Sequence, residues 1–431
     1  MRSLARVGQV IKTQREQVRE SGLERRHFVL LALLGAAAFF DGYDSAVKTL
    51  ALTQIRESFD LSKSAAAAML AVVYFGALPA MFLTRYADRI GRRRMLVWSV
   101  MGYTVFSGLT ALAPNAAAYS SLQFCQQVFL VAEGALVWTM AAEELPAKAR
   151  GLGFGILGML IALGTGAAAI LYGGIFESFH EGWRWMYVVG VPPLLAVAVL
   201  RRNLPESQRF EAAKDGGRLA ERWQQIFAPP YGRWLVLVVI TTCLLQFATQ
   251  AGAFAIDFLQ TDRGISTGLA NFMLVMAGLP GIPIMVVAGS LSDRFGRRVV
   301  GCGFGLASMV GGLGFFWLPG GFPVLLVCMS VMLIGTLGSF PVLSTFVTEL
   351  FPTGLRSSAT SWSGTATVLG RTVSLGLGAI LLQFVNQSWT ATLLGGGTLI
   401  GIVLVAAAFP DTHGKELEET SGEEIAVPLL L

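Results

Sequence analysis

The chain has few charged residues and few of the side chains that bind metals or form disulfides. Charged residues make up 14% of the 431 residues, and the sequence contains three histidines and four cysteines. Cys125, Cys243, Cys302 and Cys328 have neither the spacing of a disulfide framework nor the short spacing of a metal site. So few charges in so long a chain argue against a soluble protein. Because histidines and cysteines are also few and lack the spacing of a metal site, we expect no metal ion and no cofactor.

Hydrophobic residues fill the rest of the chain in long runs. They make up 54% of the sequence, and segments of about 20 residues, the length that crosses a bilayer as a helix, recur throughout. In one of them Pro280 and Pro283 flank Gly281, which predicts a bend. We predict an all-α membrane protein with twelve transmembrane helices, in residues 28–52, 64–84, 95–113, 119–142, 152–175, 184–200, 234–257, 269–289, 299–318, 323–346, 358–384 and 389–409.

Basic residues are concentrated on one side of this predicted topology. Of the 32 Lys and Arg residues, the predicted outer loops hold only Arg56, Lys63, Arg184 and Arg263. The positive-inside rule then places both termini in the cytoplasm, and we expect no nucleic-acid partner. The predicted parts are a basic tail (1–27), an N-terminal six-helix bundle (28–200), a cytoplasmic linker (201–233), a C-terminal six-helix bundle (234–409) and a second cytoplasmic tail (410–431).

Two short motifs each occur twice at nearly the same separation. Residues 84–93 (TRYADRIGRR) recur about 205 residues later as residues 289–298 (GSLSDRFGRR). Residues 143–150 (EELPAKAR) recur at about the same distance as residues 349–356 (ELFPTGLR). Two unrelated motifs that repeat at one offset indicate an internal duplication, so we expect two pseudo-symmetric bundles.

The repeated basic motif resembles a loop of the major facilitator superfamily, which joins the second and third helices and recurs between the eighth and ninth. That loop reads roughly Gly-x-Leu-Ala-Asp-Arg-x-Gly-Arg-Arg, and the copy at 289–298 matches it more fully than the copy at 84–93. The resemblance covers essentially the whole chain. It implies a secondary transporter that alternates between inward-open and outward-open states around a central site.

Both repeated motifs have the composition of a conformational latch. Gly91 and Gly296 permit a tight turn, and glycine is the residue that does so without strain. Asp88 and Asp293 can pair with arginines or helix ends in one state and release them in another. We predict a latch made of Asp88, Arg89, Gly91, Arg92, Glu143, Arg150, Asp293, Arg294, Gly296, Arg297, Glu349 and Arg356.

Five ionisable residues fall deep inside predicted spans, where an unpaired charge is costly. Asp41, Asp44 and Lys48 lie on or near one face of the first span, Glu133 lies near the middle of the fourth, and Arg371 near the middle of the eleventh. Three acids and two bases leave one negative charge uncompensated. Because burial and a neighbouring like charge favour the protonated form of a carboxylate, we predict that one of the three acids binds a coupled proton.

Two further motifs resemble the aromatic acid:proton symporter branch of the superfamily. Residues 41–44 (DGYD) match its Asp-Gly-x-Asp signature, and residues 370–371 (GR) match the Gly-Arg of its eleventh helix. The resemblance implies uptake of an organic anion with a proton, with the arginine in contact with the substrate carboxylate. We assign the substrate site to Arg371, Lys48, Gln127, Gln246 and Gln250.

The fourth span departs from that branch. The branch carries an arginine there, whereas this chain has Gln126, Gln127 and Glu133. The change leaves room for a zwitterionic, neutral or cationic substrate.

Our leading hypothesis is proton-coupled import of a small organic acid, aromatic or another metabolite carboxylate, by a monomeric transporter in a bacterial plasma membrane. A proton antiporter that exports a drug or metabolite stays open, since Glu133 stands in the fourth span. Sugar uptake stays open too, because residues 205–207 (PES) and 410–415 (PDTHGK) resemble motifs of sugar porters. A ligand sensor would need a signalling domain, for which the linker is too short. An intramembrane enzyme would need a nucleophile–base pair, and none stands out in the spans.

Overall fold

The computed structural model describes residues 22–202, 204–215, 223–251 and 254–421. Within these ranges the regular secondary structure is helical throughout, and each of the twelve predicted spans contains a helix. The N-terminal half contributes α2 (Arg25–Leu50), α3 (Leu52–Ser58), α4 (Lys63–Phe75), α5 (Ala80–Ile90), α6 (Arg92–Thr110), α7 (Ala116–Glu144), α8 (Arg150–Gly174) and α9 (Gly182–Arg201).

The C-terminal half has the same order of helices. It contributes α11 (Tyr231–Ala251), α12 (Ala255–Thr261), α13 (Thr267–Gly278), α14 (Gly281–Phe295), α15 (Arg297–Trp317), α16 (Phe322–Glu349), α17 (Arg356–Leu381) and α18 (Gln387–Ala408). Short helices α10 (Gln208–Asp215) and α19 (Leu417–Ser421) follow the two halves. In the described part of the chain, ten helices are long and apolar enough to cross a membrane, and α6 and α11 occupy the other two predicted spans.

Two of the predicted spans are broken at a proline. α13 ends at Gly278 and α14 begins directly after Pro280, so the predicted bend is confirmed as a break between two helices. In the N-terminal half α5 begins directly after Pro79, and α4 has ended at Phe75. Proline has no N–H to donate to the preceding turn, so a continuous helix is interrupted at both places. The repetition of the break agrees with an internal duplication.

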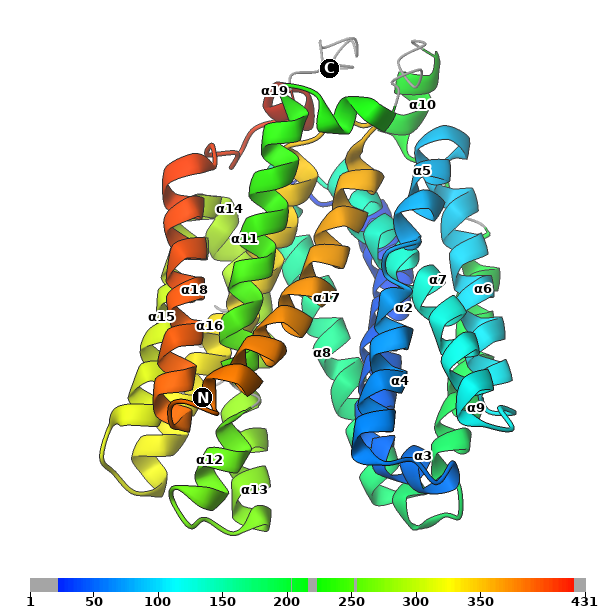
Figure 1. Cartoon of the computed structure of the whole chain (residues 1–431). Coiled ribbons are helices and arrows are strands. Elements are labelled where there is room, and N and C mark those ends of the chain that lie inside the picture. Colours follow the sequence, from blue (N-terminus) through cyan, green and yellow to red (C-terminus); the bar gives the residue numbers. More distant parts are fainter. Residues whose placement is uncertain (1–21, 203, 216–222, 252–253, 422–431) are drawn as a thin grey trace, which may run out of the picture.

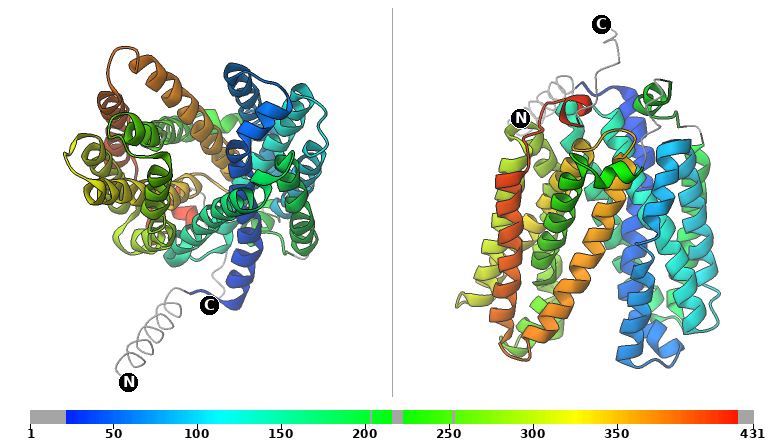
Figure 2. Two further views of the ribbon diagram at one scale, coloured as in Figure 1. Left: turned by 90° about the horizontal axis from the view of Figure 1, so that it is seen from below. Right: turned by 45° about the horizontal axis from the view of Figure 1, so that its top comes forward.

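The two halves form separate groups of helices that stand side by side (Figure 1 and Figure 2, left). They approach each other at the end of the molecule that carries α10 and α19 and diverge toward the end that carries α3 and α12 (Figure 1). We call these the α10/α19 end and the α3/α12 end. Contacts between the halves run mainly from α8 to α14 and from α17 to α5 and α7.

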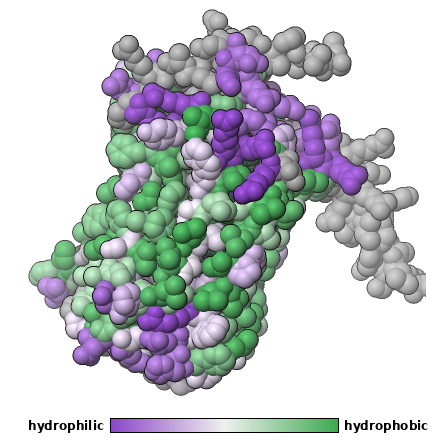
Figure 3. Space-filling model, turned by 90° about the vertical axis from the view of Figure 1, so that its right-hand side faces the viewer, coloured by the Kyte–Doolittle hydropathy of each residue, from purple (hydrophilic) through white to green (hydrophobic). Residues whose placement is uncertain are grey.

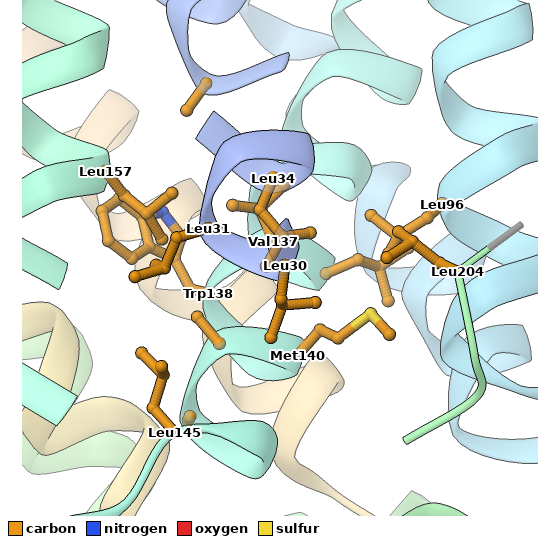
Figure 4. Close-up of a cluster of buried hydrophobic side chains, with 14 of the residues drawn as sticks. Leu30, Leu31, Leu34, Leu96, Val137, Trp138, Met140, Leu145, Leu157 and Leu204 are labelled. Carbon is orange, nitrogen blue, oxygen red and sulfur yellow. The ribbon is translucent and has the colours of Figure 1, made fainter. Parts of the chain in front are cut away.

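Each half has hydrophobic cores of its own. In the N-terminal half a cluster that includes Leu34, Val137 and Leu157 packs α2, α7 and α8 together (Figure 4). A second cluster around Tyr119 and Trp183 lies among α2, α7 and α9. The C-terminal half likewise contains two separate clusters. Because each half is packed internally, the two can move relative to each other as units.

An apolar band covers the outer side of the N-terminal half (Figure 3). Figure 3 shows the side formed by α6 and α9, where hydrophobic residues lie between two hydrophilic ends. Large hydrophobic side chains exposed on these helices include Trp98, Val105, Val188 and Val199. Such a band suits contact with lipid tails and agrees with the predicted membrane setting.

Glycine allows α2 and α8 to approach closely. A Cβ atom added at Gly164 would lie 1.8 Å from the carbonyl oxygen of Phe39, and one at Gly42 would lie 1.9 Å from that of Ile161. No side chain fits at such distances, so both positions require glycine. This contact also fixes the part of α2 that carries Asp41 and Asp44.

We expect Gly164→Ala to lower the thermal unfolding midpoint of the detergent-solubilised protein by about 3–8 °C, because the methyl group must push α2 and α8 apart. Gly166→Ala is the matched control, since a Cβ added at Gly166 meets nothing within 4 Å. Equal midpoints for the two variants, measured by tryptophan fluorescence, would contradict the close-packing argument.

Candidate functional site

Three of the predicted residues form a closed polar group on α2 and α7. The Lys48 ammonium lies 3.0 Å from Asp44 Oδ2 and donates to Gln127 Oε1 over 2.9 Å. All three side chains are buried. The predicted i,i+4 pair therefore forms, and Lys48 is a compensated cation rather than a free one.

A second buried ion pair joins α7 to α9. Arg201 Nη1 lies 2.6 Å from Glu133 Oε1, and neither side chain is exposed to solvent. The rest of the guanidinium donates to the carbonyl oxygens of Leu33 (3.2 Å) and Leu34 (3.3 Å) on α2. The guanidinium is thus held by three helices at once.

Arg201 is a residue that the sequence analysis misplaced. We assigned it to the cytoplasmic linker because it directly follows an apolar run, but it is the last residue of α9 and its side chain reaches back into the bundle. A helix-terminal arginine can do this because its long apolar stem spans the distance. The one signal in the sequence was the uncompensated negative charge of the intramembrane set.

Asp41 lies beside the Glu133–Arg201 pair, and no described cation forms an ion pair with it. Its carboxyl is within hydrogen-bonding reach of the Glu133 carboxyl, and its Oδ2 atom faces Gly134. Asp41 is partly exposed, whereas Asp44 and Glu133 are buried. The three acids predicted to bind a proton therefore lie in one region of the N-terminal half.

Arg371 lies in the opposite half, on α17. Its side chain is exposed, and its Nε atom donates to Gln246 Oε1 of α11 over 3.1 Å. Among the described residues no carboxylate forms an ion pair with Arg371. Arg371 and Gln246 border a cavity of ≈ 140 Å³ whose polar wall includes Ser308, Thr336 and Thr398. The side chain of Gln250 lies outside the described residues.

Tyr74 of α4 brings the N-terminal half close to Arg371, with which it interacts electrostatically. A small apolar pocket between α4 and α17 is lined by Tyr74, Phe75 and Val368. The Arg371 guanidinium therefore borders a polar cavity of its own half and interacts with Tyr74 of the other half. This arrangement can hold a small molecule that has one anionic end and one apolar end.

The predicted latch residues gather where the two halves meet, at the α10/α19 end. Two glutamate–arginine pairs cross from one half to the other. Glu143 Oε1 lies 2.9 Å from Arg356 Nη1, and Glu349 Oε1 lies 2.9 Å from Arg150 Nη1. All four side chains are buried. Arg92 and Arg297 reinforce the pairs, each 3.2 Å from the glutamate of its own half.

The two aspartates of the basic motifs also bridge the halves. Asp293 accepts hydrogen bonds of 2.8 Å from the backbone N–H groups of Gly151 and Leu152, at the start of α8. Asp88 accepts from the N–H (3.2 Å) and hydroxyl (2.8 Å) of Ser358 in the first turn of α17. A carboxylate at a helix N-terminus is favoured because the unpaired N–H groups there carry partial positive charge.

Other members of the predicted latch have different surroundings. Gly91 and Gly296 adopt φ values of 113° and 93°, which favour glycine, so the predicted tight turns are present. Arg89 and Arg294 are exposed on the outer surface. Glu206, which sequence reasoning treated only as part of a short motif, accepts from the N–H groups of Arg92 and Arg93.

The segment after α18 also contacts this end of the molecule. Arg209 of α10 lies 2.6 Å from Glu416 Oε2 and 2.8 Å from Glu418 Oε1, and it donates to the carbonyl oxygen of Glu143. Burial opposes the charge of Glu418, but the hydrogen bond and charge of Arg209 outweigh it and lower the pKa of that carboxyl. The linker and the C-terminal segment therefore join the same charged network.

Among the described residues no group of three or more His, Cys, Asp or Glu side chains could hold a metal ion.

The chain resembles known transporters over most of its length. The sequence model of the Major Facilitator Superfamily matches residues 34–255 and 238–431. A gentisate transporter of Corynebacterium glutamicum is 24% identical over 92% of this chain and 92% of its own. A gallate transporter of Pseudomonas putida is 25% identical over 82% of this chain and 87% of its own.

The fold agrees with that assignment. The solved structure of a proton:xylose symporter bound to 6-bromo-6-deoxy-D-glucose superimposes with a TM-score of 0.77 at 20% identity, over 91% of this chain and 98% of that one. At this identity the likeness concerns the fold. The prediction from the repeated loops is confirmed: the chain belongs to the major facilitator superfamily, a family of membrane transporters that are not enzymes.

Proposed function

We propose that the protein imports a small organic acid together with a proton. The observation that carries this proposal is Arg371, a cation on α17 that is exposed and unpaired by any described carboxylate. A guanidinium offers a planar fork of donors that matches a carboxylate. Tyr74 interacts with it electrostatically, and the apolar pocket that Tyr74 and Phe75 line between α4 and α17 suits the apolar part of such a molecule.

The charge balance supports an anion over the alternatives. Lys48 and Arg201 are compensated within the N-terminal half, so Arg371 is the intramembrane cation left for a ligand. A neutral sugar would leave that charge without a counter-ion. Export of a cationic drug was suggested by Glu133, but Arg201 neutralises this acid. The relatives that carry gentisate and gallate, which are aromatic acids, favour the same substrate class.

The proton is assigned to the group of Asp41, Asp44 and Glu133. Two carboxyls within hydrogen-bonding reach of each other are most stable when they share a proton, because two adjacent negative charges in a low-dielectric bundle repel. Asp41 and Glu133 have this geometry. Binding of a proton in one half and of an anion in the other then precedes movement of the halves.

The latch defines the state of the transporter. With the α10/α19 end in the cytoplasm, as the distribution of basic residues predicts, the buried pairs between the halves close the inner side. The diverging α3/α12 end then faces outward, in the arrangement that receives a substrate for import. Release inside requires the glutamate–arginine pairs and the aspartate bridges to separate, and each is replaced by contacts with water.

The test of the proposed function is proton flux in proteoliposomes while aromatic acids, aliphatic acids, sugars and cationic drugs are added in turn. We expect alkalinisation of the external medium with an aromatic acid and none with sugars. Proton movement against a cationic drug would contradict import and support an antiporter.

We expect Arg371→Lys to raise the KM for the acid by about tenfold or more, because an ammonium keeps the charge but loses the bidentate fork. Arg371→Gln, which removes the charge, should reduce uptake further. Arg233→Lys is the matched control, since Arg233 is exposed at the start of α11. An unchanged KM for the acid in Arg371→Lys would rule out direct contact with the carboxylate.

We expect Asp293→Asn to shift the protein toward the inward-open state. The neutral amide cannot replace the charged bridge to the N–H groups of Gly151 and Leu152. Accessibility of a cysteine placed in α8 to a cytoplasmic thiol reagent should rise several-fold. Asp262→Asn, which changes an exposed aspartate between α12 and α13, is the control. Equal accessibility in both variants would exclude Asp293 from the latch.

A further inference from the structure

The three acids of the N-terminal half differ in what surrounds them. Asp44 has Lys48 as its counter-ion at 3.0 Å, and Glu133 has Arg201 at 2.6 Å. Asp41 forms an ion pair with no described cation, although it is within hydrogen-bonding reach of Glu133. Asp41 is also the one of the three that is not fully buried, although its Oδ1 atom is. These differences separate one acid without a counter-ion among the described residues from two that each have one.

This inference rests on the proposed symport. We propose that Arg201 holds Glu133 as a permanent carboxylate, so that Asp41 alone takes up the coupled proton. Each transport cycle then moves one proton with one monoanion and no net charge. Arg201 is therefore a positioning residue that acts through Glu133.

The groups around Asp41 agree with this assignment. Glu133 on α7 and Asp44 on its own helix oppose a negative charge on Asp41, and Arg201 on α9 favours one. Tyr103 on α6 also faces this group, but its hydroxyl donates to the carbonyl oxygen of Phe40. Arg201 is already bonded to Glu133 and to two carbonyl oxygens of α2, so it is engaged away from Asp41. The proton shared by the two carboxyls consequently resides on Asp41.

Inclusion of Arg201 changes the charge of the whole site. Asp41, Asp44 and Glu133 are matched by Lys48, Arg201 and Arg371, so the empty, deprotonated site is neutral. A proton alone makes it positive and a monoanion alone makes it negative, whereas both together restore neutrality. A charged site is disfavoured when it must cross a low-dielectric interior. The empty and the fully loaded states are therefore the ones that reorient, which couples proton to monoanion one to one.

Electroneutrality can be measured directly with reconstituted protein. Gentisate, or the panel acid that gives the largest proton flux, is the probe, and valinomycin with potassium clamps the membrane potential at zero or at −100 mV. We expect the ratio of internal to external acid to be the same at the two membrane potentials, within a factor of two. Net movement of one charge would change the ratio by about 50-fold, the factor that corresponds to 2.3 kcal/mol per 100 mV. Such a change would overturn electroneutrality while leaving symport intact, whereas absence of proton flux with every acid would overturn the proposed function itself.

The role of Arg201 is tested by the pH profile of uptake in three variants. Arg201→Gln removes the counter-ion of Glu133, so the protonated state is favoured and the pH midpoint of uptake should rise by about one unit or more. Glu133→Gln leaves Arg201 without a partner beside Asp41, so the midpoint should fall. The double variant Glu133→Gln/Arg201→Gln removes both charges and should return toward the natural profile.

A purely structural role would give a different pattern. If Arg201 only stabilises packing, both single variants lose folded protein without opposite shifts in pH midpoint, and the double variant is no better than either. Rates are therefore normalised to folded protein measured by gel filtration. Arg201→Lys, which keeps the charge, should keep the natural midpoint even if less of it folds. Shifts of the same sign in Arg201→Gln and Glu133→Gln would overturn the proposal.

Discussion

Charge buried in an apolar bundle is the constraint on which this structure depends. An ionised side chain taken out of water is destabilised by several kcal/mol unless it is paired and hydrogen-bonded, and removal of one partner from a buried pair costs about 3–5 kcal/mol. The described part of the chain meets this demand with buried pairs at both of its charged centres, and Asp41 and Arg371 are the exceptions without a charged partner there. Asp44 with Lys48 and Glu133 with Arg201 are buried pairs inside one half, and Glu143 with Arg356 and Glu349 with Arg150 are buried pairs between halves.

Where a pair is formed decides what it can do. A pair inside one half moves with that half and keeps its partners when the halves separate. A pair between the halves exists only while they are in contact, so it contributes to the balance between two arrangements. The duplication places two equivalent glutamate–arginine pairs about the interface, together with the aspartate bridges of Asp88 and Asp293. The contact at the α10/α19 end is thereby closed by many moderate interactions, and no single one of them holds it.

The segment that follows α9 lies between these two centres. Arg201 at the end of α9 is bonded to Glu133, and Glu206, five residues later, is bonded to the backbone at the start of α6. Four residues separate Arg201 from Glu206, so one short covalent segment joins the Glu133–Arg201 pair to the basic loop before α6.

The fold class, the internal repeat and the family can be predicted from the amino-acid sequence alone. Long apolar runs require helices in lipid, because every backbone polar group must be bonded within its own segment, and repeated motifs report on the order of helices whatever their packing. The sequence also identified the acids at positions 41, 44 and 133 and the arginine at 371, since a charge within an apolar run is visible without a structure.

Which charges are compensated becomes visible in the packing of the helices. The partner of an acid depends on how helices are packed and on where a long side chain reaches, and neither follows from the position of a residue along the chain. Arg201 was assigned to the linker on that ground, yet it is buried against Glu133 on a different helix. Arg371 is a second example. The described groups around it come from α11, α15 and α16, and no described carboxylate pairs with it. The sequence therefore names the groups that can carry charge, and the packing of helices decides which of them remain free to bind.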